Sequence, residues 1–275
     1  METLLRDIRY GIRFFLRNAA FSAVAVIILA LGIGATSSIF SVINSVLLKD
    51  LPFKDPARLV SLYGNFTQLS KAPVSGADYL DWKKRSQSFS GMSCFAAYGS
   101  HNLSGVDHAE QLRSVFVSAD LFSTLGVQPM IGRNFLPYED QPDHFHVVLL
   151  SHGLWKRRFG SDPGLVGKTI KLEGLDYTVA GVMAPGFQFP LVSSDFAFPA
   201  DLWVPLPMTA KRASDRNTNY LRIIGRLKNG VSIERARIEM DVIAKSMEKE
   251  YPATNTGDRV LLVSYREDVI GNSRV

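Results

Sequence analysis

The chain has 275 residues, of which 46% are hydrophobic and 11% aromatic, with a single cysteine, Cys94. This composition indicates a globular protein of one large or two small domains, and it excludes a disordered, collagen-like or disulfide-stapled chain. The net charge is +5, and four arginines against two acidic residues give +2 for residues 1–20 alone. The rest of the chain has a net charge of +3, which is too small for a nucleic-acid-binding surface.

An uncharged stretch of 31 residues lies between Arg17 and Lys49. As an α-helix it would be about 46 Å long, whereas the hydrocarbon core of a bilayer is about 30 Å thick. We therefore expect a transmembrane helix over residues 21–48, whose increasingly polar second half extends beyond the bilayer. A cleaved signal peptide is the alternative, but its apolar region spans only about 7–15 residues.

The basic residues before this stretch predict its orientation. By the positive-inside rule, residues 1–20 are cytoplasmic and everything after Lys49 is extracytoplasmic. At helical spacing these residues form an amphipathic helix with leucine and isoleucine on one face and basic residues on the other, namely Arg6, Arg9, Arg13 and Arg17. Such a helix either anchors the span to anionic lipid or also offers a docking surface to a cytoplasmic partner.

Small residues recur within the predicted span, at Ala30, Gly32, Gly34 and Ser38. Small residues allow helix backbones to approach closely in lipid, so they predict a neighbouring helix. No later stretch is long enough to be a second span. The neighbour is then expected from another subunit or from a larger polytopic protein.

After Lys49 the pattern becomes one of alternating short strands and helices. The first half predicts strands over 59–63, 92–98 and 111–117. A helix over 75–89 is expected to be capped by Ser75, with core residues Tyr79, Leu80, Trp82 and Phe89. A short helix is expected to start at Ser118 or Asp120 and to end before Gly126.

The second half predicts a strand over 147–151, a helix over 152–160 and a hairpin of strands 168–174 and 176–183 joined through Gly174. Residues 184–217 are rich in proline and serine and have weak periodicity. A strand over 221–227, a helix over 232–251 and a strand over 259–265 complete the chain. Apolar residues recur at helical spacing in that last helix, at Ile233, Ala236, Met240, Ile243 and Met247.

This order of elements predicts two lobes within residues 50–275. The outer lobe is a discontinuous α/β lobe of about 57–126 and 219–268, and a β-rich lobe of about 129–215 is inserted into it. The expected fold class is therefore α+β, with a single N-terminal transmembrane helix before the two-lobed part.

Two sequence motifs resemble a phosphate-binding loop and a metal site, but the residues around them do not fit either. Gly167–Lys168–Thr169 imitates the end of a phosphate-binding loop, but Asp162 stands where that loop requires glycine, and a strand follows instead of a helix. His144, His146 and His152 lie near Asp140 and Asp143, yet no third metal ligand has convincing spacing. Because no nucleophile or zinc motif is present either, we expect no catalytic residue, cofactor or metal site and no enzyme activity.

Several longer stretches resemble one family. DIRYGIRFFLRN and ALGIGATSSIFSVINSVLL are followed in order by VSGADYLDWKKRSQSF, VSADLFSTLGVQPMIGRNF, LSHGLWKRRFGSDPGLVGKTIKLEGLDYTVAGVMAPGF, DLWVPL and GRLKNGVSIERARIEM. Over nearly all its length the chain resembles the N-terminal portion of a MacB/FtsX-type ABC transporter permease, particularly the duplicated orphan permeases. That portion consists of the first transmembrane helix and the MacB-like periplasmic core domain.

The resemblance implies a two-lobed core and a permease that works as a dimer with a separate cytoplasmic ABC ATPase. It also implies that ATP-driven motion passes through the membrane to the periplasmic domains. Family members continue after this core into three more spans, so we expect the chain to be a fragment, a split-gene product or a truncated permease.

The leading interpretation is a non-catalytic permease subunit of the inner membrane, or an N-terminal fragment of one. Its partners would be the membrane, the ATPase subunit, and a second copy or further permease spans, without nucleic acid. The alternative is a single-pass scaffold or sensor that binds a periplasmic protein. An anchored enzyme is a third reading, with the least support from the residues.

Overall fold

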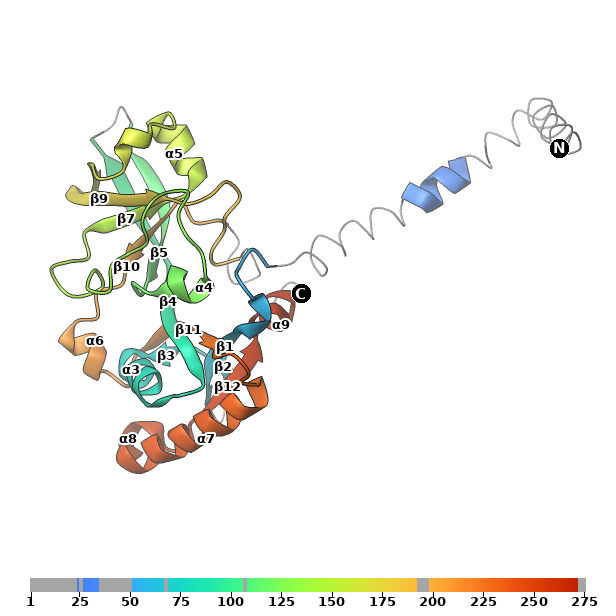
Figure 1. Ribbon diagram of the computed structural model, residues 1–275, viewed down its shortest axis with the longest axis vertical. Coiled ribbons are helices and arrows are strands. Elements are labelled where there is room, and N and C mark those ends of the chain that lie inside the picture. The colour runs from blue at the N-terminus through green and yellow to red at the C-terminus, as the bar shows by residue number, and fades with distance from the viewer. Residues whose placement is uncertain are drawn as a thin grey trace, which may run out of the picture. The chain divides into compact units, whose positions relative to one another are not determined.

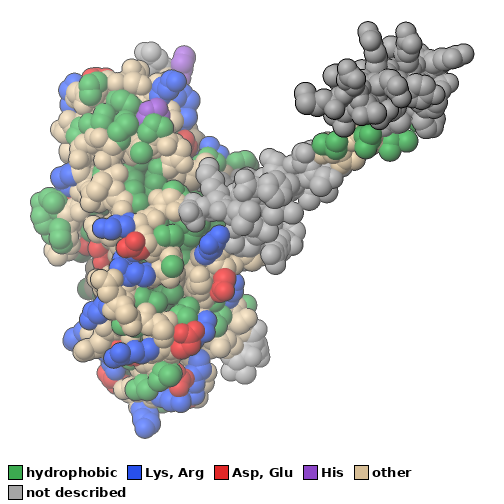
Figure 2. Space-filling view, turned by 45° about the vertical axis from the view of Figure 1, so that its right-hand side comes forward, with side chains coloured by type: hydrophobic (Ala, Val, Ile, Leu, Met, Phe, Trp, Pro, Cys, Tyr) green, Lys and Arg blue, Asp and Glu red, His purple; other side chains and the backbone are tan. Residues whose placement is uncertain are grey.

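The computed structural model describes residues 24, 27–34, 51–66, 69–105, 108–191 and 198–271. The chain divides into two units, Met1–Asp50 and Leu51–Val275. In the first unit, residues 27–34 are helical and expose their apolar side chains to between 57% and 67%, as Ile27, Ile28, Leu29, Leu31 and Ile33 do. Figure 2 shows them as an apolar surface.

Most of the predicted transmembrane helix, and all of residues 1–20, lie outside the described residues. Within the described part of the chain, no helix is both long and apolar enough to span a bilayer. The span over residues 21–48 therefore stays a prediction.

The second unit is a mixed α/β structure built on one twisted sheet (Figure 1). The strand order is β12-β1-β11-β4-β5-β10-β7-β9-β6, with β2 on β1, β3 on β11, and β8 on β4 and β9. The strands are β1 (Leu59–Phe66), β2 (Leu69–Ala72), β3 (Val74–Ser75), β4 (Phe89–Ser104), β5 (Glu110–Val117), β6 (Ile131–Gly132), β7 (Val147–Leu150), β8 (Thr169–Leu172), β9 (Leu175–Val182), β10 (Leu202–Pro205), β11 (Asn219–Leu227) and β12 (Arg259–Ser264). Neighbours are antiparallel except for β5 with β10 and β7 with β9.

The helices pack against this sheet in separate places (Figure 1). They are η2 (Pro56–Arg58), α3 (Gly76–Arg85), α4 (Leu121–Leu125), α5 (His152–Phe159), η3 (Pro163–Leu165), α6 (Ala210–Ser214), α7 (Ile233–Glu250), α8 (Pro252–Asn255) and α9 (Tyr265–Gly271). α3 and α7 lie near β12, β1, β11 and the start of β4, whereas α5 lies at the end of the sheet formed by β7 and β9.

Local signals place most helix ends where the sequence predicts them. Ser75 caps α3 by accepting a hydrogen bond from the Asp78 backbone N–H, and Gly126 ends α4 at φ 69°. Gly174 has φ 78° and follows Glu173 at φ 52°, which is the left-handed pair that a two-residue hairpin turn requires. These features depend on residues a few positions apart, so the sequence predicts them directly.

Other elements differ from the expectation. α3 ends at Arg85 and β4 already begins at Phe89, so the predicted helix over 75–89 is too long. The carboxylate of Glu239 on α7 accepts hydrogen bonds from the Gln87 and Ser88 backbone N–H groups, which holds this link outside the helix. The weakly periodic stretch 184–217 contains β10 and α6, and β10 is too short to show a period.

Three hydrophobic clusters lie along the sheet. The first centres on α4 and includes Phe53, Phe122, Trp203 and Tyr265. The second joins α3 and α7 to β1, β11 and the start of β4, and Trp82 belongs to it. The third joins α5 to β7, β8 and β9 around Trp155. The 16-residue strand β4 contributes to all three, with Met92, Phe95 and Leu103, and so connects them.

Candidate functional site

The predicted helix-packing residues fall only partly within the described chain. Ala30, Gly32 and Gly34 lie on the exposed helix 27–34, and a Cβ atom added at either glycine would meet nothing within 4 Å. The other predicted site residues lie outside the described residues, namely Ser38, Arg6, Arg9, Arg13 and Arg17. Their roles stay predictions.

The segment that leads into the sheet, residues 51–58, is fastened by its one buried aromatic side chain. Phe53 is 6% exposed and belongs to the central hydrophobic cluster. Its ring contacts the edge of Phe187 at a centroid distance of 6.5 Å and that of Tyr265 at 5.8 Å. Edge-to-face pairs of this kind are each worth about 1 kcal/mol beyond the buried area. We call residues 51–58 the lead-in segment.

A buried arginine of β11, Arg226, holds the same segment by hydrogen bonds to its backbone. The Arg226 guanidinium on β11 donates through Nη2 to the Lys54 carbonyl at 2.6 Å, and through Nε to the Thr124 carbonyl at 2.5 Å. A third donor reaches the Asp55 carbonyl at 3.3 Å. Burial, followed by the neighbouring Arg58, lowers the pKa of Arg226. Because all three acceptors are backbone carbonyls, this link holds the chain's path and does not depend on any acidic side chain.

Arg58 adds a second link between the lead-in segment and β11. Its Nε and Nη2 donate to the Leu227 carbonyl at 2.9 and 2.6 Å. Two guanidinium groups therefore attach the lead-in segment to the end of β11. Arg58 belongs to the lead-in segment and donates to β11, whereas Arg226 belongs to β11 and donates to the lead-in segment.

The last described helix, α9, is fastened beside it. The Asp268 carboxylate is 4% exposed and accepts hydrogen bonds from Ser61 Oγ at 2.8 Å and Tyr63 Oη at 2.5 Å, both on β1. Lys71 Nζ on β2 donates to the other carboxylate oxygen at 2.8 Å. Tyr265 at the start of α9 is buried among the same aromatic rings as Phe53. We call the lead-in segment and α9 together the terminal junction.

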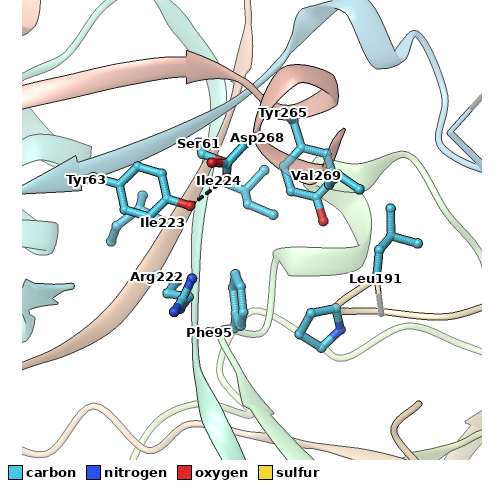
Figure 3. Close-up of a pocket in the computed structure, with 11 residues that line it drawn as sticks. Ser61, Tyr63, Phe95, Leu191, Arg222, Ile223, Ile224, Tyr265, Asp268 and Val269 are labelled. Atoms are coloured by element: carbon cyan, nitrogen blue, oxygen red, sulfur yellow. Dashed lines mark hydrogen bonds between the residues drawn. The ribbon is translucent and has the colours of Figure 1, made fainter. Parts of the chain in front are cut away.

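Figure 3 shows the small cavity beside this junction. The side chains of Tyr63 and Tyr265 flank Asp268, and Phe95, Arg222 and Leu191 lie across from them. Its volume is about 30 Å³, room for about one water molecule and far below the roughly 300 Å³ of small-molecule sites. The arrangement is thus suited to holding two chain segments together, not to binding a substrate.

The buried phenols are fixed in their protonated form. Burial, with the Asp268 charge as the second cause, raises the pKa of Tyr63 far above its ordinary value. The same two causes raise that of Tyr265. At neutral pH Tyr63 is therefore protonated and donates its hydrogen bond to Asp268.

The three histidines considered as metal ligands each pack against an aromatic ring. The rings of His144, His146 and His152 pack respectively on Tyr138, Tyr177 and Trp155. Among the described residues, no group of three or more histidine, cysteine or acidic residues is arranged to hold a metal ion. Burial raises the pKa of the Cys94 thiol to about 12, which keeps it protonated and unreactive.

Arg226 and Asp268 were not among the residues predicted from the sequence. Arg226 is one of two arginines in the apolar strand LRIIGRL, and Asp268 follows the last strand, so neither residue belongs to a recognisable motif. The available signal was weak: an arginine whose strand neighbours are apolar must bury its charged end against acceptors.

Sequence comparison decides the family. The sequence model of the MacB-like periplasmic core domain matches residues 22–243, which is most of the chain. The chain belongs to this family.

Solved structures share the fold of this core domain. A domain of a permease protein from Porphyromonas gingivalis is 15% identical, with a TM-score of 0.58, and the match covers 78% of this chain and 93% of that one. The periplasmic region of MacB from Actinobacillus actinomycetemcomitans is 14% identical, with a TM-score of 0.53 and coverage of 80% and 95%. The extracellular domain of the noncanonic ABC-type transporter YknZ from Gram-positive bacteria is 14% identical, with a TM-score of 0.51, and the match covers 74% of this chain and 99% of that one. No curated protein matches the chain significantly.

Proposed function

We propose that the chain is a non-catalytic permease subunit, or part of one, in a MacB/FtsX-type ABC transporter. Residues 1–20 lie along the cytoplasmic face of the inner membrane, residues 21–48 cross it, and residues 50–275 form the periplasmic core with the two lobes predicted from the sequence. A separate cytoplasmic ATPase drives the subunit, which works as a dimer or together with further permease spans for export.

The terminal junction is the observation that carries this proposal. The lead-in segment follows directly on the predicted span, and it is attached to the sheet through Phe53 and Arg226. α9 is attached to the same region through Asp268 and Tyr265. A displacement that reaches the lead-in segment would therefore act on the sheet itself, because the attachments join rigid elements.

The apolar helix 27–34 supports the membrane part of the proposal. A helix whose described side chains are apolar and exposed on all sides is stable only where lipid or another protein covers it. The small residues Ala30, Gly32 and Gly34 then permit close packing against a neighbouring span.

The coupling role is tested by breaking the predicted transmembrane helix over residues 21–48. In the permease that carries this domain, reconstituted in nanodiscs with its ATPase, nitroxide labels at the exposed Lys156 of α5 report the distance between subunits. We expect ATP to change this distance, and the double variant Ile33→Gly, Ile39→Pro to abolish the change while ATPase assembly persists. The matched control is Ile33→Ala, Ile39→Ala, which keeps the helix. An undiminished change in the Gly-Pro variant would refute the coupling role.

Photo-crosslinking separates this proposal from the alternative of a single-pass scaffold or sensor. A photo-reactive residue at Arg9 or Arg13 is expected to capture an ABC ATPase. Its consistent absence among the crosslinked products would favour the scaffold.

A further inference from the structure

Part of the sheet closes into a ring of paired strands. β4 pairs with β5, β5 with β10, β10 with β7, β7 with β9 and β9 with β8, and β8 pairs again with β4. Strands of this ring contribute Leu103, Leu112, Leu172 and Val179 to the third hydrophobic cluster, so they share one apolar core. A closed ring has no free edge, and two paired strands must separate before it can open.

The pairing of β4 with β8 closes the ring along a short seam. Its Cα partners are Leu103 with Leu172 and Ser104 with Lys171. The Glu173 backbone N–H also donates to the Asn102 carbonyl at 3.0 Å, and Glu173 Oε1 accepts from the Asn102 backbone N–H at 2.7 Å. We call these contacts the β4–β8 seam. It can separate while β9 stays paired with β7, because β8 belongs to the hairpin and β9 alone joins that hairpin to β7.

A buried histidine on β4, His101, packs beside this seam. It is 7% exposed, and its Nδ1 lies 2.8 Å from Ser114 Oγ on β5. Its ring centroid lies 5.6 Å from that of Phe116 on β5 and 6.1 Å from that of Tyr177 on β9. The imidazole therefore joins β4 and β5 to the hairpin that carries the other side of the seam.

The surroundings of His101 favour the neutral imidazole. Burial lowers the pKa of His101 below its ordinary value of 6.5, against the opposing effect of the Glu173 carboxylate. A histidine that becomes exposed when the seam separates regains its ordinary pKa and binds a proton more readily. The closed seam therefore keeps its full stability above pH 6.5 and loses stability as the pH falls from 6.5 through the lowered pKa.

The other ionisable groups on the elements around His101 are committed to other contacts. Burial raises the pKa of the Tyr177 phenol, which keeps it uncharged in this pH range. The ring of a second histidine, His146, packs on Tyr177 at a centroid distance of 5.1 Å. The charged side chains are paired, Lys171 with Asp176 at 3.0 Å and Arg113 with Asp201 at 3.4 Å. His101 and Glu173 are therefore the two groups whose titration bears directly on the seam.

We propose that His101 is a pH-operated latch, which holds the β4–β8 seam closed while its imidazole is neutral and opens it on protonation. Opening places the imidazolium in solvent beside the exposed Glu173 and frees the pairing edges of β4 and β8. The latch requires neither the span nor the ATPase, so it can fail without affecting the coupling role.

The test is hydrogen exchange of the full 275-residue chain in nanodiscs, measured by mass spectrometry at pH 7.5 and pH 5.0. Each rate is divided by the intrinsic chemical rate at that pH. We expect peptides covering residues 101–105 and 169–174 to exchange at least threefold faster at pH 5.0 on this scale, whereas β11 shows no such change. Equal normalised rates in the seam at the two pH values would overturn the proposal.

Two histidine variants assign the effect. His101→Gln retains a polar group opposite Ser114 but does not titrate, so the acceleration at pH 5.0 is expected to disappear. His101→Phe, which retains an aromatic ring, gives the same comparison if the glutamine variant lowers Tm at pH 7.5. His146→Phe is the matched control and should keep the acceleration. Acceleration that persists in both His101 variants, or that His146→Phe removes, would overturn the assignment.

Glu173→Gln distinguishes the two groups that titrate at the seam. The amide oxygen still offers an acceptor to the Asn102 N–H, but the charge that raises the pKa of His101 is gone. The acceleration is therefore expected to begin at a lower pH than in the native chain. Its complete loss in this variant would identify Glu173 as the titrating group and overturn the role of His101.

Discussion

Arg226 is the residue on which the path of the lead-in segment depends most. Arg226 is 9% exposed, and its guanidinium donates hydrogen bonds to the carbonyls of Lys54, Asp55 and Thr124. Shape alone cannot replace it, because methionine fills a similar volume without donating a hydrogen bond.

We expect Arg226→Met to lower the free energy of unfolding by about 3 kcal/mol, since three backbone carbonyls lose their hydrogen bonds to the guanidinium at once. Urea unfolding of the chain followed by circular dichroism measures this change as a lower midpoint. Arg235→Met, on the exposed face of α7, is the control and should change stability by less than about 0.5 kcal/mol. Equal midpoints for the two variants would contradict the role of Arg226.

A second residue-scale effect concerns Asp258. Burial, and then the charges of Asp78 and Glu248, raise its pKa from 3.8 to about 6, against the opposing effect of Arg259. Between these values the folded chain holds a proton that the unfolded chain releases. This group therefore makes folding less favourable as the pH rises from about 4 to about 6, and the full cost remains above that.

Asp258→Asn is accordingly expected to stabilise the domain at pH 7.5, by about 1 kcal/mol once solvent screening of this partly exposed group is allowed for. The gain should shrink below pH 6 and vanish near pH 4. Thermal unfolding at several pH values measures it. A gain equal at pH 4 and pH 7.5 would contradict the assignment.

At the scale of elements, α9 differs from the longer helices in how it is held. α7 buries a stripe of apolar residues at helical spacing, Ala236, Met240, Ile243 and Met247, as the sequence predicts. The seven-residue α9 depends on Tyr265 and on the three donors to Asp268. Its attachment is therefore concentrated in one carboxylate.

Asp268→Asn is expected to loosen α9 without unfolding the sheet. The neutral amide weakens the pairing with Lys71 and presents a donor where the site needs acceptors. Hydrogen exchange of the α9 amides should accelerate at least tenfold, while exchange in β4 and β5 stays the same. Glu267→Gln, an exposed neighbour on the same helix, is the control. Unchanged α9 exchange in Asp268→Asn would show that Tyr265 alone holds the helix.

At the scale of the whole core domain, the continuous sheet predicts one cooperative unfolding unit. The three tryptophans report on it independently, because Trp82, Trp155 and Trp203 belong to different hydrophobic clusters. β4 passes through all three clusters, so none can lose its packing without disturbing the next.

With 5-fluorotryptophan incorporated, we expect the three ¹⁹F resonances of the folded chain to lose intensity at the same urea concentration. Conservative Trp→Phe variants assign the resonances. Earlier loss of the Trp155 signal would show that the part containing α5 unfolds as a separate unit.

The surface of the core domain is mixed in charge at this scale. Figure 2 shows Lys and Arg side chains interspersed with Asp and Glu over one face of residues 51–271. This face is therefore not an extended basic surface.

The sequence by itself determined the features set by residues a few positions apart. These are the serine cap of α3, the glycine that ends α4, the hairpin of β8 and β9 and the apolar stripe of α7, all confirmed in the structure. Family membership was also readable, since it rests on the order of many short motifs.

Only the tertiary structure decided the terminal junction and the placement of β10. Asp268 meets Ser61 across 207 positions of sequence, and Arg226 meets Thr124 across 102. β10 pairs in parallel with β5 after a connection of more than eighty residues, and its four residues carry no period of their own. Such contacts depend on where distant segments lie once the hydrophobic clusters have formed. Local hydrophobic patterns and secondary-structure propensities therefore cannot predict them.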